Sequence, residues 1–525
     1  MPFRHRLRDF LKTKHAPILL LLAVALIVGL FTFQDYGMAW DEFLFYKYAD
    51  AIGYAYSIPA HLSPDFNLDN AYGPSGGDHK NHGPAYLLVA RLAVYGLHAL
   101  TNIDQIALWH LVNFVTFLIG AYFVYRIGLR WLSPYSAIAA TALYLTQPVL
   151  WGHAFINPKD PPFATVFIAA LYFGLLMVDH LSSPGFSGRK IWRDVVITGI
   201  LIGLATNIRV IGPLLGVMLI LYALLKSQKK TLLWFVPIAL IAILVTYITW
   251  PYLWHSPIKT FIDVLRIMAS YPTTPKVLFL GNFYRSYDLP HRYLPWLLGI
   301  TLTEPVWPFF ILGSVMAAIR FLKRRLEWKS LSIVLFWFVF MMLYALIVHP
   351  PMYDGYRHFL FILPPIFILA GFVFDEIYQR ISLKWLYSLL VVITLLPGII
   401  GGVRLHPYQY TYYNILVGGT GGAAGVYETD YWLTCYKEAV EQLIPYAEEP
   451  VNLFVRREYT WLLTTRPKIS TSWITNEGQS MRATTCWTIP APTLPCNVSR
   501  ILIPTFYASN EKALSSVKSK RDERT

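Results

Sequence analysis

The sequence predicts an all-α polytopic membrane protein of about eleven transmembrane helices plus an interfacial helix, with a small C-terminal α/β domain outside the membrane. Three observations support this fold class. Of 525 residues, 55% are hydrophobic and only 14% are charged, whereas soluble proteins carry about 25% charged residues. Runs of about twenty apolar residues, long enough to span a bilayer, recur along most of the chain. Basic residues collect in alternate loops between these runs.

The first apolar run follows a basic amino terminus, as in a signal peptide. No small-residue cleavage site follows it and many more apolar runs do, so we expect a retained first helix. Eleven spans then place the amino terminus inside and the tail outside. The expected spans are 17–33, 105–125, 134–152, 161–180, 194–206, 210–225, 231–248, 294–319, 330–348, 358–378 and 385–402.

The distribution of Lys and Arg favours this orientation. The segments expected inside hold 20 Lys and Arg in 58 residues, and the outer loops hold 11 in 136. Cytoplasmic loops are enriched in these residues in membrane proteins. Because the inner loops also explain most of the net charge of +14, we do not expect a nucleic-acid partner.

Residues 84–100 are apolar enough to form a twelfth span, which would reverse every later loop. Arg91 lies at the middle of this segment, and an arginine at bilayer depth is expensive. We therefore expect a helix that lies in the membrane interface, within a first outer loop of residues 34–104.

The tail, residues 403–525, alternates short β-like runs such as 451–455 with turn residues and a predicted helix over 437–447. It also holds the three cysteines, Cys435, Cys486 and Cys496. The absence of a C-x-x-C spacing argues against a metal knuckle or a redox motif. One disulfide with one remaining thiol is compatible with the sequence.

Asp41 and Glu42 stand in the first outer loop, soon after the first span. A carboxylate at this place can act as the general base on an acceptor hydroxyl. With His82 of the same loop, Glu42 could instead hold a divalent metal such as Mg²⁺ or Mn²⁺. The alternative is a solvated carboxylate that caps a short helix.

Three further charged groups lie in outer loops next to the ends of spans. Lys159 and Asp160 form a turn in which the lysine could bind phosphate, although Asp160 could simply cap the next helix. Arg209 could clamp a lipid phosphate or extend to lipid headgroups. Arg357 and His358 could bind an anion at a helix start, or belong to an interfacial aromatic belt.

Together these residues suit transfer of a group from a lipid phosphate to a hydroxyl, because they combine acids with phosphate-binding cations on one face of the membrane. The span interiors hold almost no ionisable residues, whereas transporters place charges near the midplane. A lipid or sugar-lipid transporter, a ligase that uses a diphosphate-linked glycan, and an assembly factor acting through the tail remain alternatives.

At this point the chain resembles the GT-C class of membrane glycosyltransferases, in particular the protein O-mannosyltransferases and aminoarabinose transferases, over residues 15–400. The resemblance lies in the order of five short elements. They are Asp41-Glu42, His82-Gly83-Pro84, Tyr125-Arg126-Ile127-Gly128-Leu129-Arg130, Asp160, and Arg357-His358 followed by Leu363-Pro364-Pro365. The chain departs from the family pattern at Gly83, where proline is usual, and at residues 157–160. The run from Tyr408 to Tyr436 looks like a subgroup feature without an assigned role.

The resemblance implies a transmembrane catalytic domain over residues 1–402 and an inverting hexosyl or pentosyl transferase. Its donor would be a polyprenyl-phosphate sugar, and its acceptor a glycan, a lipid or a protein. Asp41 would be the general base, assisted by Glu42, and Asp160 would organise the acceptor pocket. Donor phosphate would be bound by Lys159, Arg209, Arg357 and His358. A bacterial inner membrane, with a cytoplasmic amino terminus and a periplasmic or extracellular tail, is the expected location.

Overall fold

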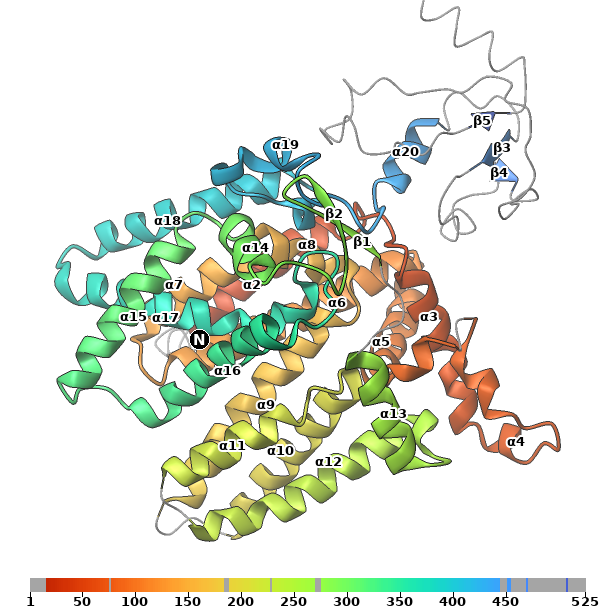
Figure 1. The fold of residues 1–525 in the computed structure, drawn as a ribbon, viewed down its shortest axis with the longest axis horizontal. Helices are drawn as coiled ribbons and strands as arrows, with labels where there is room; N and C mark the ends of the chain where they lie inside the picture. Colours follow the sequence, from red (N-terminus) through yellow and green to blue (C-terminus); the bar gives the residue numbers. More distant parts are fainter. Residues whose placement is uncertain are drawn as a thin grey trace, which may run out of the picture.

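The computed structural model describes residues 16–74, 77–183, 188–226, 229–269 and 275–443, together with strand residues 451–454, 469–470 and 507–508. Helices dominate these residues (Figure 1). The first helices are α2 (Ala16–Thr32), α3 (Glu42–Ala51), α4 (Ile58–His61), α5 (Ala85–Thr101), α6 (Gln105–Gly128), α7 (Pro134–Leu145), α8 (Pro148–Ile156), α9 (Asp160–Leu181), α10 (Gly188–Ile208), α11 (Leu214–Leu225) and α12 (Phe235–Thr249). They are followed by α13 (Pro257–Ala269), α14 (Tyr293–Thr301), α15 (Val306–Leu322), α16 (Trp328–Val348), α17 (Pro364–Arg380), α18 (Lys384–Arg404), α19 (Gly419–Ala423) and α20 (Tyr436–Leu443).

Six helical segments in the described part of the chain are long and apolar enough to cross a membrane, and one bent pair makes a seventh. The six are α6, α9, α10, α16, α18 and the segment Thr231–Thr249 that contains α12. Three shorter apolar helices, α2, α5 and α11, accompany them. The predicted all-α membrane fold is confirmed, whereas the predicted number of eleven spans is not.

Helix α9 forms the centre of the bundle. In its most apolar stretch 83% of the residues are buried, against 17% for α18 at the edge. It packs against α6, α10 and α11, and α10 in turn packs against α12 (Figure 1). Pro161 and Pro162 occupy its first turn, where the missing N–H groups would have no helical partner in any case. The polar turn before Asp160 is therefore fixed directly on the buried core.

Two of the predicted spans are wrong as continuous helices. The span expected over 134–152 breaks between α7 and α8, and the span expected over 294–319 breaks between α14 and α15, which meet at 107°. Pro148 and Pro305 stand at the two breaks, and proline supplies no N–H to continue a helix.

The side chain of Gln147 joins these two breaks. Its amide nitrogen donates to Leu143 O at 2.8 Å and to Thr303 Oγ1 at 3.0 Å, and its oxygen accepts from the Thr303 N–H at 3.0 Å. A buried break is stable only when its freed polar groups find partners. Gln147 supplies such partners, and α8 can therefore leave the line of α7.

The segment expected in the interface forms α5, which leaves Val89 and Leu92 exposed. Arg91 pairs with Asp50 of α3, with 3.2 Å between Nε and Oδ1. The arginine therefore has an acidic partner on a neighbouring helix. The placement of α5 relative to a bilayer stays a prediction.

Residues 405–436 pack against the first outer loop. The Tyr36 hydroxyl donates to Gln409 Oε1 at 3.0 Å, and the Trp40 N–H donates to Trp432 O at 3.1 Å. A Cβ on Gly37 would lie 2.0 Å from Thr434 O, so only glycine permits this approach.

A hairpin covers the other side of the 405–436 segment. Its antiparallel strands are β1 (Lys276–Phe279) and β2 (Asn282–Arg285). The Glu428 N–H donates to Leu278 O at 3.2 Å, and the Gly281 N–H donates to Val426 O at 2.9 Å. The segment is thus fixed between the first outer loop and the hairpin.

Beyond α20 the structure describes three short strands, β3 (Val451–Phe454), β4 (Ile469–Ser470) and β5 (Tyr507–Ala508). Strand β3 pairs in parallel with β4 and antiparallel with β5. The Cys435 sulfur lies 3.5 Å from Asp430 Oδ2. Cys486 and Cys496 lie outside the described residues, so the disulfide and the separate C-terminal domain stay predictions.

Candidate functional site

Arg357 lies at the centre of a group of charged and aromatic side chains. Its side chain is only 7% exposed and lies 3.4 Å from Asp41 Oδ2 and 3.6 Å from Asp354 Oδ2. The guanidinium carbon also lies 4.6 to 5.1 Å from the ring centres of Tyr353, Tyr431 and Trp432. A cation in this position is held by two carboxylates and three aromatic faces, which does not match the alternative of an interfacial aromatic belt.

Asp41 precedes helix α3, but its side chain makes no capping hydrogen bond. The carboxylate is 17% exposed and faces Arg357, so the alternative of a solvated helix cap is not supported. Burial raises the pKa of Asp41, and the neighbouring Arg357 guanidinium offsets part of the rise. A buried carboxylate with a raised pKa is better suited to accept a proton than an ordinary aspartate.

Glu42 points away from Arg357 and holds the loop in place. It is fully buried, and its carboxylate accepts hydrogen bonds from the Ala39 N–H and the Tyr46 hydroxyl. His110 Nε2 lies 3.2 Å from Glu42 Oε1. These contacts fix the backbone on which Asp41 stands.

Asp160 and Arg209 form a second charged pair. Asp160 is 2% exposed, and its carboxylate accepts from Arg209 and, at 2.9 Å, from Asn157 Nδ2. The helix is capped by Asn157, whose Oδ1 accepts from the Lys159 and Asp160 N–H groups. Arg209 therefore does not extend to lipid headgroups, and the Asp160 side chain is not the cap.

Lys159 lies between these two pairs. Its Nζ is 2.9 Å from His82 Nδ1, and among the described residues it has no carboxylate within ion-pair distance. Burial, together with the charges of Arg209 and Arg357, lowers the pKa of Lys159. Burial and the charges of Arg209, Arg357 and Lys159 likewise lower the pKa of His358.

The structure therefore brings together Asp41, His82, Lys159, Asp160, Arg209, Arg357 and His358, which the sequence places in five separate segments. Glu42 lies beside this group with different partners. Within this group the Arg209 Nε atom is buried without a hydrogen-bond partner, whereas Arg357 Nε lies 3.6 Å from Asp354 Oδ2. An unused donor such as Arg209 Nε suits an anionic ligand.

The predicted metal pair does not fit a metal ion as its side chains stand. Glu42 is held by Tyr46 and His110, whereas His82 faces the Lys159 ammonium. Within the ranges that the structure describes, no group of three or more His, Cys, Asp or Glu is arranged to hold a metal.

Sequence reasoning assigned no role to the residues that 405–436 adds to the site. Asp430 accepts from the Tyr410 hydroxyl at 2.9 Å and from the Trp432 and Leu433 N–H groups at 3.0 Å each. These bonds fix Tyr431 and Trp432 against Arg357. The dense run of aromatic residues from Tyr408 to Tyr436 was the available signal.

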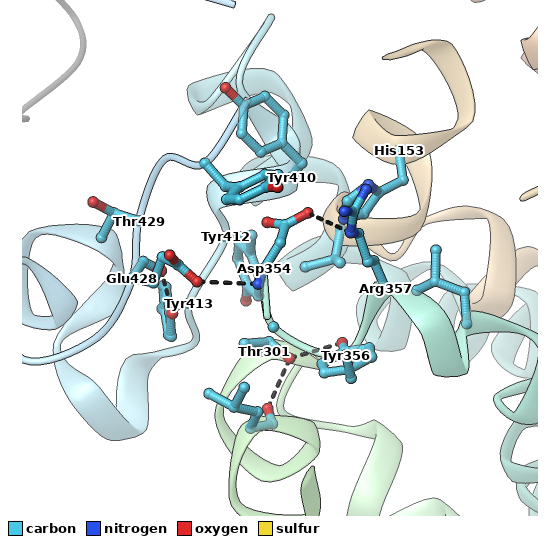
Figure 2. Close-up of a pocket in the computed structure, with 15 residues that line it drawn as sticks. His153, Thr301, Asp354, Tyr356, Arg357, Tyr410, Tyr412, Tyr413, Glu428 and Thr429 are labelled. Atoms are coloured by element: carbon cyan, nitrogen blue, oxygen red, sulfur yellow. Dashed lines mark hydrogen bonds and ion pairs between the residues drawn. The ribbon is translucent and has the colours of Figure 1, made fainter. Parts of the chain in front are cut away.

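A cavity of about 40 Å³ opens beside Arg357 (Figure 2). Figure 2 shows Asp354 between Glu428 and Arg357. The Asp354 N–H donates to Glu428 Oε2 at 3.2 Å. The other labelled lining residues are His153, Thr301, Tyr356, Tyr410, Tyr412, Tyr413 and Thr429.

Comparison of the sequence with protein-family models and with curated proteins gives no match. Solved structures do match. ArnT from Cupriavidus metallidurans, bound to undecaprenyl phosphate, aligns over 86% of this chain and 85% of its own, with 14% identity and a TM-score of 0.51. The oligosaccharyltransferase AglB from Archaeoglobus fulgidus, in complex with an inhibitory peptide and a dolichol-phosphate, aligns over 77% of this chain and 56% of its own, with 15% identity and a TM-score of 0.52. The protein thus has the membrane fold of the GT-C class.

Proposed function

We propose that the protein is an inverting glycosyltransferase that moves a sugar from a polyprenyl-phosphate donor to a hydroxyl-bearing acceptor at the outer face of the membrane. The observation that carries this proposal is the Lys159 ammonium, which lies without a carboxylate partner among the described residues and 2.9 Å from a histidine nitrogen. A partly buried cation of this kind is stabilised when an anion binds. The carboxylate of Asp41 lies in the same cluster.

The donor phosphate would lie among Lys159, Arg209, Arg357 and His358. The Nε donor of Arg209 has no hydrogen-bond partner and is available to its oxygens, and the phosphate would stabilise the ammonium form of Lys159. The solved structures with this fold give this assignment support, because ArnT is bound to undecaprenyl phosphate and AglB to a dolichol-phosphate.

Asp41 would act as the general base. The acceptor oxygen attacks the anomeric carbon and forms the new glycosidic bond, while the bond from that carbon to the phosphate oxygen breaks. The hydroxyl proton passes to Asp41, and the electron pair leaves on the phosphate, where the cations stabilise it. Attack on the face opposite to the leaving phosphate inverts the anomeric centre.

Glu42 and Asp160 would be positioning residues in this reaction. Glu42 fixes the loop below Asp41 through the Ala39 N–H, and Asp160 holds Arg209. Asp160 would thereby organise the acceptor side as well as the phosphate side. Because the side chains of Glu42 and His82 do not fit a metal, the proposed reaction is written without one, and a requirement for Mg²⁺ or Mn²⁺ would be seen as a loss of transfer in EDTA.

The test is release of undecaprenyl phosphate from a panel of undecaprenyl-phosphate sugars by the full-length protein in liposomes, with mixed bacterial membrane lipids and glycans as acceptors. We expect one donor to release the monophosphate, and the Asp41→Asn variant to release none above background. Release of a diphosphate from a diphosphate-linked glycan, or movement of intact donor across the membrane without bond cleavage, would contradict the proposal.

A further inference from the structure

Two histidines from separate segments of the chain meet at its surface. His291 precedes α14, and His349 follows Val348, the last residue of α16. His291 Nδ1 and His349 Nε2 are in direct contact, and the centres of the two rings lie 3.6 Å apart. Neither histidine takes part in the proposed transfer reaction. The pair is therefore a separate feature of the molecule, and the exposed His291 makes it accessible to solvent.

A backbone carbonyl group lies next to both histidine nitrogens. Leu346 O is 2.9 Å from His291 Nδ1 and 3.0 Å from His349 Nε2. Within a helix this oxygen would accept from the N–H of residue 350, but that residue is Pro350, which has no N–H. Leu346 O is thus free of the helical hydrogen bonds, and three atoms with lone pairs converge on one point.

Hydrogen bonding does not satisfy all three atoms at once. If both nitrogens carry a proton and donate to Leu346 O, the two protons collide between the rings. If one nitrogen has no proton, its lone pair faces the lone pairs of the carbonyl oxygen. A cation bound between the three atoms accepts a lone pair from each of them and so removes the conflict.

The geometry points to a metal site: we propose that His291 Nδ1, His349 Nε2 and Leu346 O bind a divalent transition-metal ion such as Zn²⁺. Imidazole nitrogen is the commonest protein ligand for these ions, whereas Mg²⁺ prefers oxygen. The two nitrogen-to-oxygen separations, 2.9 and 3.0 Å, are close to those between neighbouring ligands that each lie about 2.1 Å from a central ion. Rotation of the exposed His291 ring would open the contact between the nitrogens to a similar separation. Water would complete the coordination.

The ion would join two segments next to Arg357. His349 begins the segment that leads from α16 to Arg357, and the Met352 N–H of this segment donates to Ser286 O at 3.1 Å. His291 lies shortly after Ser286 in the sequence. A metal bound by both histidines would therefore hold the two segments together at a second point.

The test is isothermal titration of Zn²⁺ into the full-length protein in nanodiscs, without an affinity tag and at neutral pH, with Mg²⁺ as the comparison ion. We expect one Zn²⁺ site that His291→Gln and His349→Asn each weaken by about tenfold or more, because each substitution removes an imidazole ligand. Asn suits the left-handed backbone of residue 349, whose φ is 54°, so this variant should fold.

His98→Gln is the matched control. His98 Nδ1 also lies close to a backbone carbonyl, 2.7 Å from Ile103 O, but no second histidine ring faces it in the part of the chain that the structure describes. Binding of Zn²⁺ should be unchanged in this variant. Equal affinity for Zn²⁺ in wild type, His291→Gln and His349→Asn, or Mg²⁺ binding as tight as that of Zn²⁺, would overturn the site.

Electron paramagnetic resonance of bound Cu²⁺ gives a second readout that needs no variant. We expect hyperfine coupling of the copper to the nitrogens of two imidazole rings, and coupling to fewer than two would contradict the site. Because the metal is titrated without donor or acceptor, the inference does not rest on the proposed function. Loss of the metal site and loss of the transferase reaction are therefore seen separately.

Discussion

Helix α9 carries an acidic residue near each end, Asp160 buried and Asp179 half-buried, and the surroundings of the two residues differ. At its start, Asp160 belongs to the Asp41–Arg357 cluster, which also contains Lys159 and Arg209. Near its end, Asp179 pairs with Arg130 at 2.7 Å and with Lys226 at 3.1 Å. Arg130 also donates to the hydroxyls of Tyr222 and Ser330. These residues form the Arg130–Asp179 cluster.

The two clusters differ in whether their polar atoms are paired. In the described residues, no side-chain atom of the Arg130–Asp179 cluster is buried without a hydrogen-bond partner, whereas Arg209 Nε of the Asp41–Arg357 cluster is, and Lys159 has no carboxylate within ion-pair distance. A satisfied network stabilises helix packing, while an incomplete one is expensive unless a ligand completes it. Charge alone therefore does not identify the site, and incomplete pairing does.

The largest expected effect separates Asp41 from Asp179. Asp41→Asn should lower the rate of undecaprenyl phosphate release by about 10²- to 10⁴-fold, because a general base is lost, with little change in thermal stability. Asp179→Asn should do the opposite. It should lower stability by about 1–3 kcal/mol, since the ion pair is partly exposed, and should leave the rate per folded molecule unchanged.

A fast Asp41→Asn variant, or a slow but stable Asp179→Asn variant, would remove the distinction between the clusters. Thermal unfolding and initial rates measured on the same preparations decide between these outcomes.

The pH dependence gives a smaller effect. Asp41 accepts a proton only when ionised, and its pKa is raised by burial, so the rate should fall as pH falls through that raised pKa, by about tenfold per pH unit below it. Arg357→Gln removes a charge that lowers the pKa of Asp41, so the acidic limb of the kcat profile should move to higher pH. The same limb position in both proteins would mean that another group is titrating.

The smallest expected effect is that of replacing Gln147, and it tests how the two helix breaks are stabilised. Gln147→Ala removes the side chain that joins the two helix breaks and leaves the Thr303 N–H without its acceptor. We expect a loss of about 1–3 kcal/mol in unfolding free energy, measured by thermal unfolding, with a rate close to wild type. An unchanged melting temperature would show that the breaks are held by other contacts.

The sequence predicts the fold class because hydropathy and basic loops report directly on membrane insertion. It also indicates seven residues that the structure brings together, from Asp41 to His358, because the span interiors hold almost no ionisable residues and these seven lie in outer loops close to span ends. It does not predict the breaks at Pro148 and Pro305. Composition shows an apolar run but not its bend, and the bond from Gln147 to Thr303 joins residues 156 positions apart.

The sequence also does not predict which way the Glu42 side chain points, or that residues 405–436 contribute to the site. Asp41 and Glu42 are neighbours with the same charge, and only the packing of His110 and Tyr46 turns one of them inward. Asp430 and Glu428 reach the site because Gly37 lets the first loop approach Thr434. Contacts between residues so far apart in the sequence leave no local sequence pattern that would predict them.

The most direct test of the account is the affinity of the protein in nanodiscs for undecaprenyl phosphate, compared between Lys159→Met and Lys226→Met. Both variants remove one ammonium and keep an unbranched side chain of similar length, but Lys226 already has a carboxylate partner. We expect Lys159→Met to bind about tenfold or more weakly than wild type, since a charged hydrogen bond is lost, without loss of stability, and Lys226→Met to bind normally. Equal affinity of Lys159→Met and wild type would contradict the claim that this cluster binds the donor phosphate.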